Sequence, residues 1–257
     1  MSNPDWSATS DDYAKHRQGF PPRFFEMIAR DGLFAPGMQV LDLGTGTGVV
    51  ARALAERGAA VLGLDVAPGQ VAAARRLAEQ QGLADRARFE EGFAERTGQA
   101  AASFDLVVAG QCWHWFDRRL AAAEAMRVLK PGGALLISHF DWLPLPGSVA
   151  HASEFLIEAH NPHWPMARTT GFYPAWAQDL ALGGFRGIAF SGFDHDALYS
   201  HADWRGRIRA SAGIGGALKG EAVERFDAEH AALLGARFPQ EPLTVPHRVF
   251  AIWGRRP

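Results

Sequence analysis

The chain has 257 residues, of which 47% are hydrophobic. This is enough for a full catalytic core and excludes a peptide hormone, a disulfide-stabilised miniprotein and a disordered tail. The net charge is −2, from 26 basic and 28 acidic residues, so the chain lacks the positive field that binds nucleic acid, and no nucleic-acid partner is expected. The single cysteine, Cys112, the polar N-terminus and the absence of a long apolar run predict a cytoplasmic protein without leader or membrane span.

In chain order, the first predicted element is an amphipathic helix over 21–31, and residues 1–34 are interpreted as an N-terminal helical cover. Apolar strands are predicted at 39–43, 60–64, 87–90, 105–109 and 134–138, and helices at 48–57, 68–81 and 118–129. The alternation of strand and helix over 35–140 predicts a cofactor-binding core. Its fold class is α/β, a Rossmann-like, mostly parallel sheet with helices on both faces.

The pattern loosens after residue 140. Residues 141–173 contain several prolines and no clear period, so we expect an irregular segment there. A helix over 174–182, strands over 186–190 and 247–253, and helices over 201–211 and 219–236 follow. We interpret 141–176 and 195–240 as cap insertions of a single domain, placed over the C-terminal edge of the sheet, where open α/β folds bind ligands.

A glycine-rich loop, Gly44-Thr45-Gly46-Thr47-Gly48, follows the first predicted strand. Alternate glycines allow a tight turn and let a ligand approach the main chain closely. The dinucleotide fingerprint would need a glycine in place of Val49, and the Gly-Lys-Ser/Thr ending of a P-loop is absent. Asp42 adds a negative charge that disfavours a pyrophosphate and favours a cationic ligand such as an amine or a sulfonium.

Asp65 ends the second predicted strand, seventeen residues after Gly48. A carboxylate at this place in a doubly wound fold accepts hydrogen bonds from ribose hydroxyls. The alternative is that the glycines form only a turn and that Asp65 caps the next helix. The ordered succession of strand, loop, helix, strand and acid favours a nucleoside site.

Seven segments together carry a family resemblance: residues 13–17, 41–48, 63–65, 92–95, 104–109, 111–116 and 127–133. They resemble the class I S-adenosylmethionine-dependent methyltransferases, in the small-molecule branch that includes trans-aconitate and ubiquinone-biosynthesis methyltransferases. The resemblance implies a seven-stranded sheet whose last strand is antiparallel, S-adenosyl-L-methionine as cofactor and a small-molecule methyl acceptor.

The resemblance also implies which residues hold the cofactor. Arg17 would bind the methionine carboxylate or, alternatively, be a surface charge, and Val66 would pack on the adenine. Phe93 stands where many relatives have an acid, so ring contact would replace that side-chain hydrogen bond. The implied cofactor-binding residues are Tyr13, Arg17, Asp42, Gly44, Thr45, Gly46, Gly48, Asp65, Val66, Phe93, Ala94 and Gln111.

Methyl transfer is an in-line displacement in which positioning supplies most of the rate, and a base is needed only if the acceptor carries a proton. His114 follows the fourth predicted strand and is the first candidate for a base or a hydrogen-bonding group. Packing between its tryptophan neighbours is the alternative. His139 follows the fifth predicted strand and is the second candidate.

An aromatic acceptor pocket is predicted in the cap, with packing under a long loop as the alternative. The predicted substrate-binding residues are Trp115, Asp141, Trp142, Trp164, Tyr173 and Arg205. Arg205 could instead belong to a solvated helix face. Three nearby histidines, His151, His160 and His163, are considered as zinc ligands, but Pro162 disturbs their spacing, so no metal is expected.

Together these features predict an S-adenosylmethionine-dependent methyltransferase that methylates an oxygen, nitrogen or carbon of a small organic molecule. Two alternatives remain open. One is an NAD-type oxidoreductase, and the other is a non-catalytic regulator that binds a nucleoside.

Overall fold

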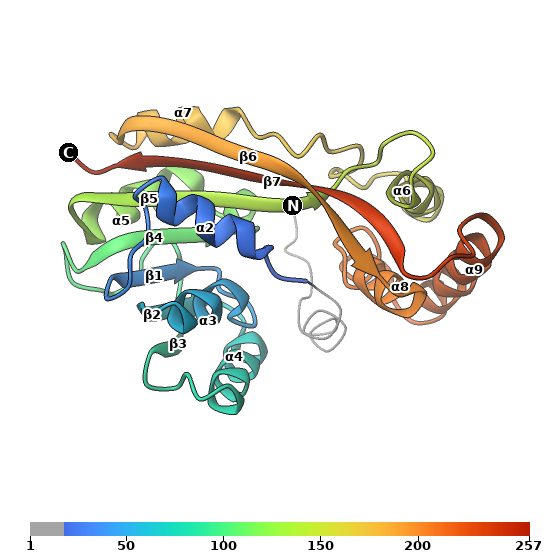
Figure 1. Cartoon of the computed structure of the whole chain (residues 1–257), viewed down its shortest axis with the longest axis horizontal. Coiled ribbons are helices and arrows are strands. Elements are labelled where there is room, and N and C mark those ends of the chain that lie inside the picture. Colours follow the sequence, from blue (N-terminus) through green and yellow to red (C-terminus); the bar gives the residue numbers. More distant parts are fainter. Residues whose placement is uncertain (1–17) are drawn as a thin grey trace. The chain divides into compact units, whose positions relative to one another are not determined.

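The computed structural model describes residues 18–257, and in these residues seven strands form one sheet in the order β3-β2-β1-β4-β5-β7-β6 (Figure 1). The strands are β1 (Gln39–Leu43), β2 (Ala60–Asp65), β3 (Ala87–Glu91), β4 (Phe104–Gly110), β5 (Leu129–Trp142), β6 (Arg186–Tyr199) and β7 (Leu243–Arg255). The helices are α2 (Pro22–Arg30), α3 (Val49–Glu56), α4 (Pro68–Gln80), the 3-10 helix η1 (Trp113–Trp115), α5 (Arg118–Val128), α6 (Val149–His160), α7 (Ala175–Leu182), α8 (His201–Arg209) and α9 (Glu221–Arg237).

The sheet is mostly parallel. Strand β1 pairs in parallel with β2 and β4, β2 with β3, and β4 with β5. Strand β7 lies next to β5 and runs opposite to it (Figure 1). Near the start of β5, Gly132 N–H donates to Arg256 O, and Arg256 N–H donates to Gly133 O. The predicted Rossmann-like fold is confirmed. Because parallel strands end at one edge, the loops after β1, β2, β3 and β4 gather there.

The chain divides into two compact units. We call Gly19–His139, Tyr173–Gly192 and Val249–Pro257 the sheet unit. Its buried side chains come from the strands and from the helices beside them. Val40, Leu41 and Leu43 of β1 are fully buried, as are Leu106 and Val107 of β4. Continuous apolar strands of this kind are typical of a parallel sheet covered on both faces.

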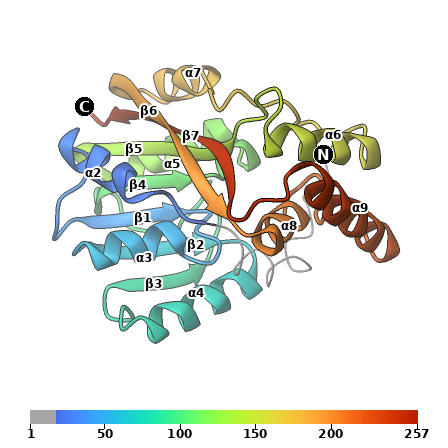
Figure 2. The same cartoon turned by 45° about the vertical axis from the view of Figure 1, so that its right-hand side comes forward.

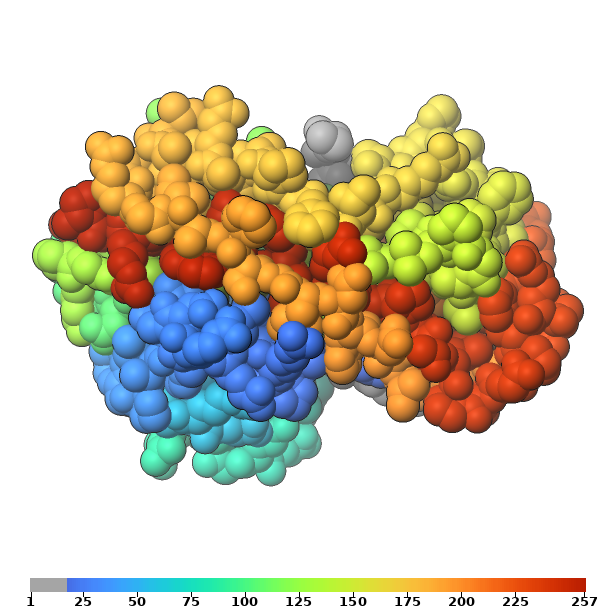
Figure 3. All heavy atoms as spheres, turned by 45° about the horizontal axis from the view of Figure 1, so that its top comes forward, coloured from blue at the N-terminus to red at the C-terminus, as the bar shows by residue number. Residues whose placement is uncertain are grey.

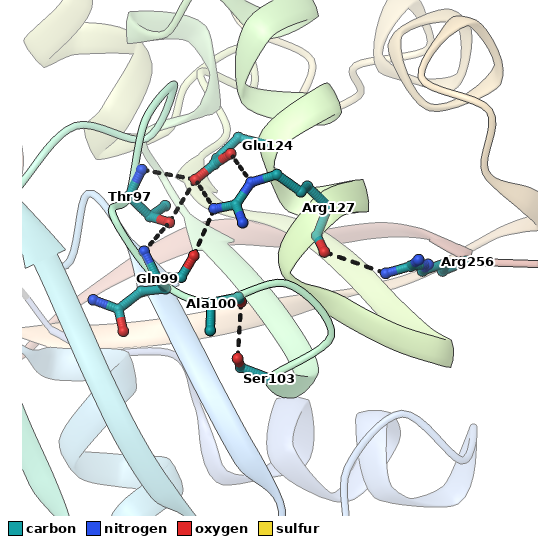
Figure 4. Close-up of polar contacts among 7 residues, drawn as sticks. All are labelled: Thr97, Gln99, Ala100, Ser103, Glu124, Arg127 and Arg256. Atoms are coloured by element: carbon teal, nitrogen blue, oxygen red, sulfur yellow. Dashed lines mark hydrogen bonds and ion pairs between the residues drawn. The ribbon is translucent and has the colours of Figure 1, made fainter.

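A polar network fixes α5 within the sheet unit (Figure 4). Glu124 Oε1 accepts hydrogen bonds from the backbone N–H of Thr97 at 2.8 Å and from its hydroxyl at 2.6 Å. Arg127 donates to both Glu124 oxygens and to Gln99 O. These contacts, with the Arg127 hydrogen bonds as the largest cause, lower the pKa of Glu124 to about 2. The network therefore ties the segment around Thr97 to α5 through an ionised carboxylate.

The other unit is called the helical unit and comprises, among the described residues, Gln18, Phe140–Phe172 and Phe193–Arg248. It contains α6, α8 and α9, seen together in Figure 2. Helices α8 and α9 are joined by ion pairs from Arg205 and Arg209 to Asp227. Helices α6 and α9 are joined by a buried hydrogen bond of 2.9 Å between Ser153 Oγ and His230 Nε2.

The structure corrects three sequence predictions. Residues 141–173 were expected to be irregular, but α6 lies in them, begun by Ser148, whose side chain accepts from His151 N–H. Strand β6 was predicted to end at Phe190 and continues to Tyr199. Strand β5 extends on both sides of the predicted 134–138.

No helix among residues 18–257 is long and apolar enough to cross a membrane.

Candidate functional site

The glycine loop follows β1 in the sheet unit, and its glycines are required by the backbone. Gly44, Gly46 and Gly48 all have positive φ, between 55° and 77°. A Cβ at Gly44 would lie 2.9 Å from Cys112 Sγ, and one at Gly48 would lie 2.7 Å from the Phe89 ring. Larger residues at these two positions would therefore both strain the turn and collide with buried side chains.

The side chain of Asp42 forms a hydrogen bond to the glycine loop. This side chain is buried, and Oδ2 accepts a hydrogen bond of 2.6 Å from the Thr45 hydroxyl. Burial raises the pKa of Asp42 to about 7. Thr45 N–H also donates to Leu64 O at 2.9 Å. The loop is thus fixed to both β1 and β2 by the buried Asp42 carboxyl and by the backbone of Thr45.

Asp65 at the end of β2 faces this loop. Its Oδ2 accepts from Gly46 N–H at 2.8 Å, and its Oδ1 accepts from Ala67 N–H at 2.9 Å. Burial raises the pKa of Asp65, while these backbone donors oppose the rise. Each carboxylate oxygen has a second lone pair, so the group has capacity left for hydroxyl donors.

Two large apolar side chains beside Asp65 are exposed to solvent. Val66 directly follows β2 and is 55% exposed, and Phe93 shortly follows β3 and is 56% exposed. Asp65 and Glu91 pair in register as the last residues of β2 and β3, so Val66 and Phe93 follow neighbouring strands at one edge of the sheet. Ala94, which follows Phe93 in the sequence, is buried. Exposed apolar side chains at the edge of a well-packed core mark a place where an apolar ring can be bound.

Gln111 follows β4 at the same edge. It has a φ of 64°, and its N–H donates to Ser138 O at 2.8 Å. A non-glycine residue in the left-handed region is uncommon and is often found at functional sites. The structure therefore brings most of the predicted cofactor-binding residues to the ends of β1, β2, β3 and β4. Tyr13 and Arg17 lie outside the described residues.

Both histidine candidates belong to one aromatic cluster of the sheet unit. The ring centroids of His114 and His139 are 5.2 Å apart, and His114 lies 4.6 Å from Trp115. His139 is buried, with Tyr173 at 4.6 Å and Trp176 at 5.1 Å. Tyr173 and Trp176 are stacked at 4.1 Å with an interplanar angle of 5°. Two of the predicted substrate-binding residues, Trp115 and Tyr173, thus share a cluster with the histidines.

The other four predicted substrate-binding residues lie in the helical unit. Asp141 is half-buried, whereas Trp142 and Trp164 are buried with ring centroids 6.4 Å apart. Arg205 is ion-paired with Asp227. The burial of Trp142 and Trp164 favours the alternative, in which these side chains pack under a long loop and do not bind substrate. Arg205 joins α8 to α9 through its ion pair, and its side chain remains 30% exposed.

The three histidines considered as zinc ligands do not meet. His160 Nε2 lies 2.9 Å from Glu229 Oε2, which is a helix-to-helix contact. Among residues 18–257, no group of three or more histidine, cysteine, aspartate or glutamate side chains is arranged to hold a metal ion.

Comparison with known proteins gives a family match over the segment that contains the glycine loop, Asp65 and His114. The family described as "Methyltransferase domain" matches residues 41–137, which run from β1 through the glycine loop and η1 into β5. We call this matched segment, which is less than half of the chain, the methyltransferase domain. This domain includes Asp65, Phe93, Gln111 and His114, and the resemblance found in the sequence is confirmed.

Relatives of the methyltransferase domain have methyltransferase names. The chain is 43% identical over 105 residues to demethylmenaquinone methyltransferase from Thermus thermophilus, a match that covers 40% of this chain and 47% of that protein. The chain spans about half the length of the curated relatives it matches.

Solved structures extend the likeness of fold beyond the methyltransferase domain. A candidate type II methyltransferase from Anaeromyxobacter dehalogenans has a TM-score of 0.68 at 23% identity and covers 93% of this chain and 97% of that one. Phosphoethanolamine N-methyltransferase 2 from Haemonchus contortus, solved with S-adenosylhomocysteine, has a TM-score of 0.58 at 18% identity and covers 98% of this chain and 57% of that one.

One polar residue was missed at the sequence level. Glu154 of α6 is buried and accepts hydrogen bonds from Trp142 Nε1 and from the backbone N–H of Arg168. It lies in the segment expected to be irregular, so no helical face was available to group it with other residues. The N-cap Ser148 and the proline-free run after it were the signals that could have found the helix.

Proposed function

We propose that the chain is an S-adenosylmethionine-dependent methyltransferase that methylates a small organic acceptor. The observation that carries this proposal is the position of Asp65. Its carboxylate is held by Gly46 and Ala67 N–H groups between the glycine loop and the exposed Val66. A carboxylate with free lone pairs next to apolar surface fits a ribose joined to a purine.

The residues present suit this cofactor. Asp65 would accept hydrogen bonds from the ribose hydroxyls, and Val66 and Phe93 would enclose the adenine from neighbouring strands. Asp42 and Gln111 would lie on the methionine side, where the negative charge of an ionised Asp42 suits a sulfonium better than a pyrophosphate. When bound, S-adenosylmethionine supplies an electrophilic methyl group.

The catalytic work left to the protein is positioning. His114 is half-buried within the aromatic cluster, so it is available to hold the acceptor and, for an acceptor with a proton, to receive that proton at its imidazole. The buried His139 would support His114, Tyr173 and Trp176 by packing. The name of one relative, a demethylmenaquinone methyltransferase, supports a quinone as acceptor, and the fold neighbour solved with S-adenosylhomocysteine supports the cofactor. A cytoplasmic location belongs to the same proposal.

Asp65→Ala tests the proposed donor site. Calorimetry should show that donor affinity falls at least about thirtyfold, because each hydrogen bond to a charged group contributes about 1.5–3 kcal/mol. Asp65→Asn, which keeps one acceptor oxygen, should lie between this variant and the unaltered protein. Asp85→Ala removes an exposed carboxylate outside the site and serves as control. Equal donor affinity in all four proteins would contradict the proposal.

A further inference from the structure

The helical unit contains a pocket of about 580 Å³ that none of the preceding assignments uses. This volume is in the range of pockets for small organic molecules. One wall is the face of α6 that carries Glu154, Phe155 and Glu158, and the facing side includes Leu145 and Arg168. Figure 3 shows α6 (yellow-green) and the segment before Tyr173 (yellow) next to each other at the surface.

The pocket has an apolar part that is open to solvent. Phe155 is 73% exposed and Leu145 is 50% exposed, although both are large apolar side chains. Leu143, which also lines the pocket, is buried. An occupant with an apolar body would remove this surface from water, which is favourable.

The arginines of the lining already have carboxylate partners. Arg168 lies 3.2 Å from Glu158 Oε1. Arg248 forms a two-pronged ion pair with Asp194, with contacts of 2.6 Å and 2.9 Å. An anionic occupant would therefore have to compete with an existing carboxylate partner at each of these arginines.

Glu154 is the carboxyl of the lining that has no such partner. It is 2% exposed, with Trp142 Nε1–H at 2.7 Å from Oε1 and Arg168 N–H at 2.9 Å from Oε2. Both donors are neutral, and none of the ion pairs found among residues 18–257 includes Glu154, although His151 acts on it electrostatically. His151 completes the titratable groups of the lining. A buried carboxylate without a counter-ion is costly, and a cation in the pocket would relieve that cost.

We propose that this pocket binds a small organic cation, an amine with an apolar aryl or alkyl body. The ammonium would face Glu154 of α6, and the apolar body would cover Phe155 and Leu145. Binding of this kind does not depend on the proposed methyl transfer. The amine could be the methyl acceptor, or an effector that is never methylated, and the experiment separates these two sources.

The test compares three probes of similar shape on the full chain at about pH 8: phenethylamine, the neutral 2-phenylethanol and the anionic phenylacetate. Calorimetry should give saturable binding of the amine, with the alcohol at least about tenfold weaker and the anion weaker still. Equal affinity for amine and alcohol, or no binding of the amine at millimolar concentration, would overturn the proposal whatever the result for the methyl donor.

Two variants locate the binding. Glu154→Gln keeps the size of the side chain and should weaken the amine at least about tenfold while leaving the alcohol unchanged. Glu56→Gln makes the same charge change at an exposed position of α3 and should leave both affinities unaltered. Phe155→Ala should weaken amine and alcohol alike, and its exposed position makes it the usable variant if Glu154→Gln does not fold. Unchanged amine affinity in folded Glu154→Gln or in Phe155→Ala would overturn the assignment.

Mass spectrometry after incubation with the methyl donor shows whether the amine is a methyl acceptor or an effector. A product heavier by one methylene means that the amine nitrogen formed a bond to the methyl carbon as the carbon–sulfur bond broke and a proton was released, so the amine is also a methyl acceptor. No product, with binding retained, means that the amine is an effector. Both results keep the pocket as an amine site, and loss of donor binding alone bears only on the proposed function.

Discussion

At the scale of single residues, His114 and His139 lie 5.2 Å apart by ring centroid but differ in access to solvent. His114 is half-buried and His139 is 2% exposed. A group that exchanges a proton with an acceptor must be reachable by it, whereas a histidine packed against Tyr173 and Trp176 contributes mainly to the shape of the site. The sequence alone ranked the two histidines in this order but could not explain the difference.

We therefore predict different consequences for the two histidines. With an acceptor that carries a proton, His114→Ala should lower kcat about a hundredfold or more while donor affinity stays unchanged. His139→Ala should chiefly lower the free energy of unfolding, by about 1–3 kcal/mol, because it leaves a gap beside two stacked rings. Turnover over a range of pH, donor calorimetry and denaturant unfolding measure these effects. An unaltered pH profile in His114→Ala would contradict the proton role.

At the scale of elements, the sequence predicted those whose pattern is local and missed those that depend on neighbours. Strand β1 was predicted with its observed bounds because it is a short apolar run next to a glycine loop. Helix α6 was missed because prolines on both sides obscured a capped stretch that contains none. The second half of β6 was missed because alternating polar residues, His195 among them, suit an edge strand as well as a loop.

The same limits apply to the candidate site. Asp65 and the glycine loop could be predicted because they follow strands directly, and parallel strands bring their ends together. The meeting of His114, His139 and Tyr173 could not be predicted, because it joins segments that are distant in sequence through side-chain packing. The environment of Glu154 was hidden for the same reason, since Trp142 and Arg168 reach it from two other segments.

The network around α5 gives a prediction at this scale (Figure 4). The pKa of Glu124 is lowered from 4.5 to about 2 in the folded chain. Its contacts therefore stabilise the fold fully above pH 4.5, and this contribution is lost as the pH falls from 4.5 towards 2. Glu124→Gln should cost about 1–2 kcal/mol at pH 7, because solvent screens part of the interaction with the exposed Arg127, and the difference from the unaltered protein should shrink by pH 3.

Urea unfolding at pH 7, 5 and 3 measures this effect. Glu79→Gln on the exposed face of α4 is the matched control and should change little at any of the three values. A Glu124→Gln cost that is independent of pH would show that the ionised carboxylate is not what holds Thr97 and Arg127 in place.

At the scale of the whole molecule, the proposed donor site and the proposed amine pocket belong to different compact units. Residues 41–137 include the loop, the acid and the first histidine of the proposed donor site, all within the sheet unit. The amine pocket lies entirely within the helical unit. Donor binding and amine binding are therefore separate properties, each with its own variants, and the failure of one leaves the other testable.

The most direct test of the central claim is a calorimetric titration of the full chain with S-adenosylhomocysteine, with NADH titrated in parallel. The structure predicts saturable binding of S-adenosylhomocysteine at one site and no measurable binding of NADH, because Asp42 and Asp65 flank a loop that has Val49 where a pyrophosphate site has glycine. Tight binding of NADH, or no binding of S-adenosylhomocysteine by a folded protein, would contradict it.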